Sequence, residues 1–130
     1  YLDTGESKGL VPEEHPSVVA AMRGSVMGAA DVVLTLGRRL DFQLAYGSPA
    51  VFGGAKFVRV GDAPGDVRDN RRGEVELFAD VGATLDALLA AAGDREPAVD
   101  RAWAADLRRQ HEERAARLRQ TMLTHATGSD

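Results

Sequence analysis

The 130-residue chain contains no cysteine, which excludes disulfide bonds and thiolate metal sites. It also lacks any apolar run near the ~18 residues that a membrane helix needs, so no membrane role is expected. Its first residues show neither the basic leader nor the apolar middle of a signal peptide. From these absences we expect a cytoplasmic protein.

The charge balance is mildly acidic, with 16 basic and 20 acidic side chains and a net charge of −4. Nucleic-acid binding usually requires a basic face, so no nucleic-acid partner is expected. The three histidines, His15, His111 and His125, lie far apart in the sequence and lack zinc-site spacing. The composition therefore argues against a nucleic-acid partner and against a zinc site.

Three short segments are predicted to be β-strands. The segment 31–36 is a nearly continuous apolar run, typical of a strand covered on both faces in a parallel sheet. The segment 56–60 alternates polar and apolar residues, and 75–78 is a third, shorter strand. Connections through helices or loops make these strands parallel, with right-handed crossovers.

The helical spacing of apolar residues predicts three helices, at 16–28, 81–92 and 97–122. Asp80 is expected to cap the second of these helices, because its carboxylate can accept a backbone N–H of the first turn. The third is a long amphipathic helix with a solvated charged face. The polar residues 124–130 are predicted to form a mobile tail.

These elements predict an α/β fold with a Rossmann-like parallel sheet flanked by helices and a long C-terminal amphipathic helix. We expect two regions, with 1–93 carrying the sheet and 94–130 forming the linker helix and tail. No internal repeat is present in the sequence.

Polar residues follow the predicted strands at their exits. Gly37 and Arg39 come after the first strand, Asp62 after the second and Asp80 after the third. The carboxyl ends of parallel strands share one edge of the sheet, where ligands settle in open α/β folds. Helix capping and salt bridging at strand ends would explain the same residues. The residues alone leave both interpretations open.

Four motifs resemble the central domain of thiamine-diphosphate-dependent enzymes of the acetolactate synthase-like group. Residues 7–16 resemble the family's GKGxxPxxHP segment, and 30–42 resemble ADxxxxxGxRLD(F/W). Residues 55–71 resemble AKxxxVDxDPxEIGxNR, and 80–81 match the acidic position before the last helix. The order and spacing of the four are more specific than any one motif.

The resemblance implies a Rossmann-like domain lying between two other domains of a longer enzyme. In the family, thiamine diphosphate and Mg²⁺ sit on the flanking domains, so this segment is expected not to catalyse by itself. In some members the central domain binds FAD or ADP. The matching positions are Gly37, Arg39, Asp62 and Asp80, although Asp62 falls between Gly61 and Ala63, where the family has its two acids.

A nucleotide fits these residue types chemically. A carboxylate can accept both ribose hydroxyls, an arginine can bind diphosphate oxygens with two bonds, and a glycine lets the backbone come close. The expected partners are the flanking domains and, in the parent enzyme, further copies in a homo-oligomer. The alternative is a non-enzymatic scaffold with an empty crevice. A nicotinamide oxidoreductase is disfavoured because no GxGxxG follows a strand.

Overall fold

The structure is a computed structural model that describes residues 1–127. The chain divides into two compact units, one formed by Met27–Pro97 and the other by Tyr1–Val26 with the chain from Ala98 onward. The first of these contains the sheet and the candidate site. No helix among the described residues is long and apolar enough to cross a membrane.

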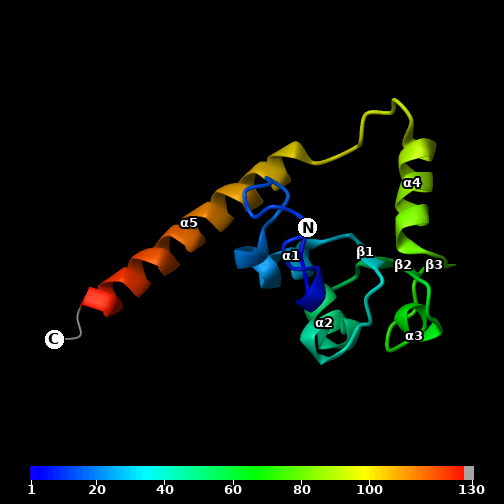
Figure 1. The fold of residues 1–130 in the computed structure, drawn as a ribbon, viewed down its shortest axis with the longest axis horizontal. Helices are drawn as coiled ribbons and strands as arrows, with labels where there is room; N and C mark the ends of the chain where they lie inside the picture. Colours follow the sequence, from blue (N-terminus) through cyan, green and yellow to red (C-terminus); the bar gives the residue numbers. More distant parts are fainter. Residues whose placement is uncertain (128–130) are drawn as a thin grey trace. The chain divides into compact units, whose positions relative to one another are not determined.

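The sheet has three parallel strands in the order β1-β2-β3: β1 (Val32–Leu36), β2 (Lys56–Gly61) and β3 (Val75–Phe78). All three lie within one residue of the predicted segments, and their parallel pairing confirms the predicted fold class. Figure 1 shows α4 on one side of the strands and α2 and α3 on the other. The strands are therefore flanked by helices, as the apolar run of β1 predicts.

One face of the sheet packs onto the connection between β1 and β2. This connection contains a 3₁₀ segment, η3 (Phe42–Gly47), and a short helix, α2 (Pro49–Phe52). Their buried side chains meet Phe57 of β2, and the Phe52 and Phe57 rings form an edge-on pair with centroids 5.2 Å apart. The resulting core contains Leu40, Leu44, Phe52, Ala55 and Phe57.

The opposite face is more open. Val60 of β2 is fully buried there, whereas Val32, Leu34 and Val75 are more than two-fifths exposed. Helix α4 (Val81–Ala92) begins directly after β3 and contacts β2. Its bounds and its Asp80 cap agree with the prediction. The short helix α3 (Pro64–Val67) follows β2, in a segment predicted only as a turn.

The first predicted helix is shorter than expected. In place of a helix at 16–28, the chain forms a 3₁₀ turn, η2 (Ala20–Met22), followed by α1 (Arg23–Ala29). The reason is that Val18 and Val19 point into a core, each only 5% exposed. Val19 adopts a φ of −131°, outside the helical region, so the helix cannot begin before it. An earlier 3₁₀ turn, η1, covers Gly5–Ser7.

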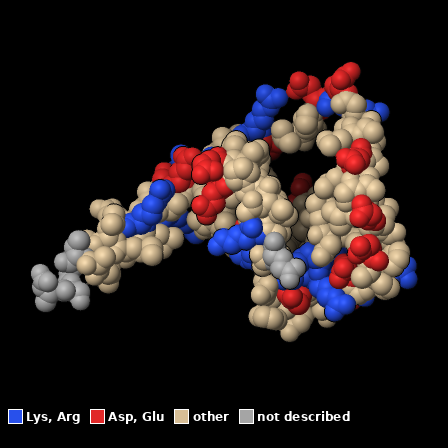
Figure 2. Space-filling view, viewed as in Figure 1, with Lys and Arg blue, Asp and Glu red and all other residues tan. Residues whose placement is uncertain are grey.

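The second unit is built around α5 (Arg101–Thr127), which packs on η2. Leu107 of α5 contacts Val19 and Met22, and the His111 ring accepts a hydrogen bond from the Ala21 amide at 3.2 Å. Charged side chains of both signs lie along this helix (Figure 2). Helix α5 begins four residues later and ends five residues later than predicted. Residues 124–127 of the predicted tail are therefore helical, and 128–130 lie outside the described residues.

Candidate functional site

The predicted site positions lie along one edge of the sheet. Leu36 pairs with Val60, and Gly61 pairs with Phe78, so the three strands end level with one another. Two backbone bonds extend this ladder past the strands, from the Gly37 amide to the Val60 carbonyl at 2.7 Å and from the Ala79 amide to the Gly61 carbonyl at 2.9 Å. The residues that follow, including Asp62 and Asp80, therefore emerge at the carboxyl edge.

Gly37 adopts a left-handed backbone conformation at this edge. Its φ is +59°, and a Cβ atom there would lie 3.5 Å from Cγ2 of Val81 in the first turn of α4. The left-handed conformation favours glycine because a Cβ atom meets the following carbonyl in that region. Gly37 thus turns the chain sharply at the end of β1 beside α4.

Asp80 caps α4. Its Oδ2 accepts the Ala83 amide at 2.8 Å, and its carbonyl accepts the Thr84 hydroxyl at 2.8 Å. This is the capping role that the sequence left as one alternative. The carboxylate remains exposed to solvent, so the cap and a ligand contact are compatible.

Arg39 lies over the start of α3. Its Nε donates to Oδ1 of Asp66 at 3.3 Å, and its guanidinium covers Gly65. The side chain is 62% exposed, so this ion pair is weak and screened by solvent. The neighbouring Arg38 turns away to Asp41 and Gln43, at 3.1 and 2.7 Å.

Asp62 differs from the other predicted residues because its carboxylate makes no hydrogen bond or ion pair within residues 1–127. The preceding Gly61, which stands at a family acid position, is covered by α3. A Cβ atom on Gly61 would lie 2.8 Å from the Cβ of Asp66. A side chain at Gly61 would push α3 off the sheet, so the available carboxylate is at Asp62.

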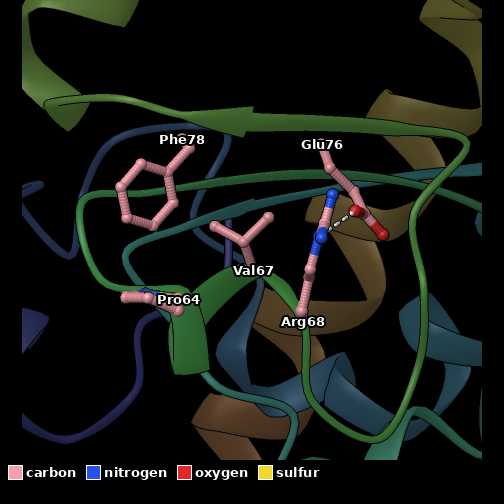
Figure 3. A pocket seen from close by; sticks show the side chains of 5 residues that line it. All are labelled: Pro64, Val67, Arg68, Glu76 and Phe78. Atoms are coloured by element: carbon pink, nitrogen blue, oxygen red, sulfur yellow. Dashed lines mark hydrogen bonds and ion pairs between the residues drawn. The ribbon is translucent and has the colours of Figure 1, made fainter.

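A shallow cleft of about 320 Å³ lies between α3 and β3 (Figure 3). Pro64, Val67 and the exposed Phe78 ring form its apolar part, and Arg68 and Glu76 form its polar part. Arg68 donates to Glu76 at 3.1 Å. Hydrogen bonds from Arg72 and, to a lesser extent, from the Gly73 amide and Arg68 lower the pKa of Glu76 to about 2. The polar part of the cleft is therefore an ion pair beside an aromatic ring.

Sequence reasoning missed the most buried polar group of the molecule, Arg59 of β2. The segment 56–60 alternates polar and apolar residues, yet Phe57 and Arg59 share a face of the strand and are both fully buried. The Arg59 guanidinium donates to the Thr35 hydroxyl at 2.8 Å and to Oδ1 of Asp69 at 2.8 Å. It also donates to three backbone carbonyls, those of Arg38, Asp66 and Arg71. These bonds join β1, the loop after it and the segment after β2.

Two further motif residues hold the same loops. The Asn70 amide donates to the Leu40 carbonyl at 2.9 Å. Arg71 donates to the carbonyls of Gly47 and Ala55, each at 2.8 Å, and its guanidinium lies 4.4 Å from the centre of the Phe57 ring. The matched Asn-Arg pair is therefore structural here, since it clamps the loop after β1 against the strand.

The fold defines a class of protein: an open parallel α/β domain, a class in which ligands bind at the carboxyl ends of the strands. Residues 1–88 match the family model described as the thiamine pyrophosphate enzyme, central domain. The chain belongs to this family. The resemblance seen in the motifs is thereby confirmed.

Curated relatives show the same relationship. The chain is 33% identical over 90 residues to 2-hydroxyacyl-CoA lyase 1 of Mus musculus, covering 68% of this chain and 16% of the relative. It is 29% identical over 90 residues to oxalyl-CoA decarboxylase of Escherichia coli (69% and 16%). An acetolactate synthase large subunit of Mycobacterium tuberculosis is 34% identical over 93 residues (71% and 17%). The chain thus spans about a sixth of the length of these relatives.

The described residues do not supply a metal site. No group of three or more His, Cys, Asp or Glu side chains within residues 1–127 is arranged to hold a metal ion. None of the described residues is therefore assigned to the Mg²⁺ of thiamine diphosphate. Those at the sheet edge are of the types that fit a nucleotide.

Proposed function

We propose that this chain is the non-catalytic central domain of a thiamine-diphosphate-dependent enzyme that forms or cleaves carbon–carbon bonds. We further propose that its sheet edge binds the adenosine part of FAD or ADP. Thiamine diphosphate and Mg²⁺ would bind to other domains of the parent enzyme. The flanking domains, and further copies of the parent enzyme, would be its partners.

The observation that carries the nucleotide proposal is the unpaired carboxylate of Asp62 at the sheet edge. Asp62 is exposed to solvent, and its carboxylate, which has no donor among residues 1–127, can accept from both hydroxyls of a ligand such as a ribose. Pro64, two residues later, lines the cleft that also holds the Phe78 ring. A cleft of about 320 Å³ is at the small end for ligand sites and suits a flat base rather than a whole nucleotide.

The competing function is a scaffold with no nucleotide. The observation that favours it is that Arg39 is engaged by Asp66 and Asp80 caps α4. Diphosphate binding would require Arg39 to leave Asp66. The exposure of Arg39 makes this exchange inexpensive, because such surface pairs contribute only about 0–1 kcal/mol.

Calorimetric titration of the purified chain with ADP and with FAD separates the two functions. We expect stoichiometric binding of one of them, weakened by about 1–3 kcal/mol in Asp62→Ala through loss of a charged hydrogen-bond partner. Asp86→Ala, which removes the same charge from the middle of α4, is the matched control and should bind normally. Absence of binding in the unmodified chain would favour the scaffold and leave the family membership intact.

A further inference from the structure

The chain separates charges of opposite sign between two segments. From Gly73 to Asp94 there are five acidic residues and no Lys or Arg, and from Arg114 to Thr127 there are three arginines and no Asp or Glu. The first segment includes α4 and the second is the C-terminal half of α5. Each segment therefore contains charged residues of one sign only, and the two signs are opposite, although Glu76 of the first pairs with Arg68 and Arg72 outside it.

Helix α4 exposes apolar side chains within its acidic segment. Leu85, Leu88 and Leu89 are 37%, 46% and 73% exposed. Asp86 and Asp94 are exposed beside them, and no cation pairs with either in the described part of the chain. Carboxylates are visible over α4 in the space-filling view (Figure 2). This surface combines an apolar stripe with unneutralised negative charge.

The C-terminal half of α5 is its counterpart. Leu118 and Met122 are 61% and 72% exposed. Arg114 makes only a long bond of 3.5 Å to the Ala21 carbonyl. Arg119 bonds the Ala115 carbonyl of its own helix at 3.3 Å.

In the first half of the same helix, however, two arginines pair with carboxylates. There Arg108 pairs with Glu112 at 2.7 Å, and Arg109 pairs with Asp106 and Glu113 at 2.5 and 2.8 Å. By contrast, none of the three arginines of the second half pairs with a carboxylate within residues 1–127. The second half of α5 is therefore the part of the helix with positive charge left to neutralise.

The two stripes have the same spacing. Leu85 and Leu89 are four residues apart on α4, and Leu118 and Met122 are four residues apart on α5. Residues four apart lie on one face of a helix about 6 Å apart along its axis. An antiparallel pair that sets Leu118 against Leu89 therefore sets Met122 against Leu85.

The same register brings the charges together. One turn before Leu118 is Arg114, and just beyond the end of α4 is Asp94. In the antiparallel arrangement these two fall opposite each other, and the helix dipoles also run in opposite directions. Hydrophobic and electrostatic matching thus select one register.

We propose that α5 of one copy of this chain docks antiparallel on α4 of a second copy, with Leu118 on Leu89, Met122 on Leu85 and Arg114 beside Asp94. Each copy carries both surfaces, so one copy can supply α5 while another supplies α4. The partner is a second copy of this chain because its own α4 supplies the complementary charge and spacing.

Sedimentation velocity over a concentration series tests the charges. We expect a dimer whose affinity falls as salt is added. Its dissociation constant should rise about fivefold in Arg114→Glu and about fivefold in Asp94→Arg, because each substitution reverses one charge of an exposed ion pair. Combining both substitutions should restore the affinity. Lys8→Glu, which makes the same charge change in an exposed loop, is the control. A monomer at every concentration, or a double variant no tighter than either single variant, would overturn the proposal.

Because the chain has no cysteine, a disulfide can test the register directly. Met122→Cys and Leu85→Cys, prepared separately and then mixed under oxidising conditions, should form the mixed disulfide faster than either forms with itself. Leu10→Cys, at a site that is 77% exposed, replaces Leu85→Cys in the control mixture and should link slowly. Equal rates of mixed-disulfide formation in the two mixtures would refute the contact between copies. That result is also the one expected if α5 contacts only α4 of the same copy.

Discussion

Arg59 shows how one residue can organise a site without touching a ligand. Its guanidinium has five N–H donors, and the structure supplies the Thr35 hydroxyl, the Asp69 carboxylate and three backbone carbonyls. A fully buried guanidinium is tolerated only when its charge and donors are satisfied in this way. The buried Arg59 side chain therefore holds the loops at the sheet edge in place.

Replacing Arg59 by Met should destabilise the chain strongly, by about 3–5 kcal/mol, because Asp69 would be left as a nearly buried charge without its cation. The measurement is urea unfolding followed by circular dichroism. Arg39→Met is the matched control, and we expect a loss below about 1 kcal/mol there because that side chain is 62% exposed. Similar losses in the two variants would contradict the role assigned to Arg59.

The same ion pair predicts a dependence on pH. Burial raises the pKa of Asp69, but the hydrogen bonds from Arg59 and from the Leu40 amide outweigh it and leave the pKa below its usual range. The unfolded value is about 3.9. The stability that Asp69 contributes is therefore complete above that pH and is lost as the pH falls through the lower folded-state pKa.

Unfolding free energies of the unmodified chain and of Asp69→Asn, measured from pH 7 to pH 3, provide the test. We expect the difference between the two proteins to be constant from pH 7 to about pH 5 and to shrink below about pH 4. Asp86→Asn, on the exposed face of α4, should show no such change. A constant difference down to pH 3 would mean that Asp69 keeps an ordinary pKa.

At the residue level, the sequence was informative about positions and less so about contacts. Gly37, Asp62 and Asp80 lie at the strand exits as predicted, because an apolar run that ends in a glycine or an acid marks where a strand leaves the core. The burial of Arg59 was not predicted, because a charged residue in a strand of alternating polar and apolar residues is normally expected to face solvent. Its partner Asp69 lies ten residues away, beyond any local pattern.

Among the elements, Gly73 controls how closely the chain before β3 approaches β2. A Cβ atom there would lie 2.7 Å from the Cγ of Arg59 and from the Val75 carbonyl, and 2.9 Å from the Phe57 carbonyl. We expect Gly73→Ala to cost about 1–3 kcal/mol of unfolding free energy through overpacking. Gly54→Ala, where nothing lies within 4 Å, should be nearly neutral in the same chemical unfolding series. A neutral Gly73→Ala would show that β3 shifts freely.

The elements that were predicted well are those whose local pattern and tertiary role agree. The strands and α4 have apolar spacing that matches the face they bury, and Asp80 supplies a local start signal. The helix predicted at 16–28 is wrong at its start because Val19 packs into a core made with Leu107 of α5, some ninety residues away. The helix α3 was missed because four residues are too few to show a period.

At the scale of the whole molecule, the chain spans about a sixth of the length of its relatives and matches the central domain of their family. We expect it to show no heat of binding with thiamine diphosphate and Mg²⁺ in calorimetry, because no described group of side chains is arranged for the metal. A full-length relative with known cofactor binding serves as the positive control. Saturable binding to this chain alone would show that part of the cofactor site lies within it.

The bonds of Arg59 reach the carbonyl of Arg38, in the loop after β1, and that of Asp66, in the loop and short helix α3 after β2. Neither loop can be lengthened or exchanged without moving an acceptor that the other depends on. Attempts to graft new specificity onto this domain should therefore transplant both loops as a matched set, since a single foreign loop would leave a donor of the guanidinium facing no oxygen.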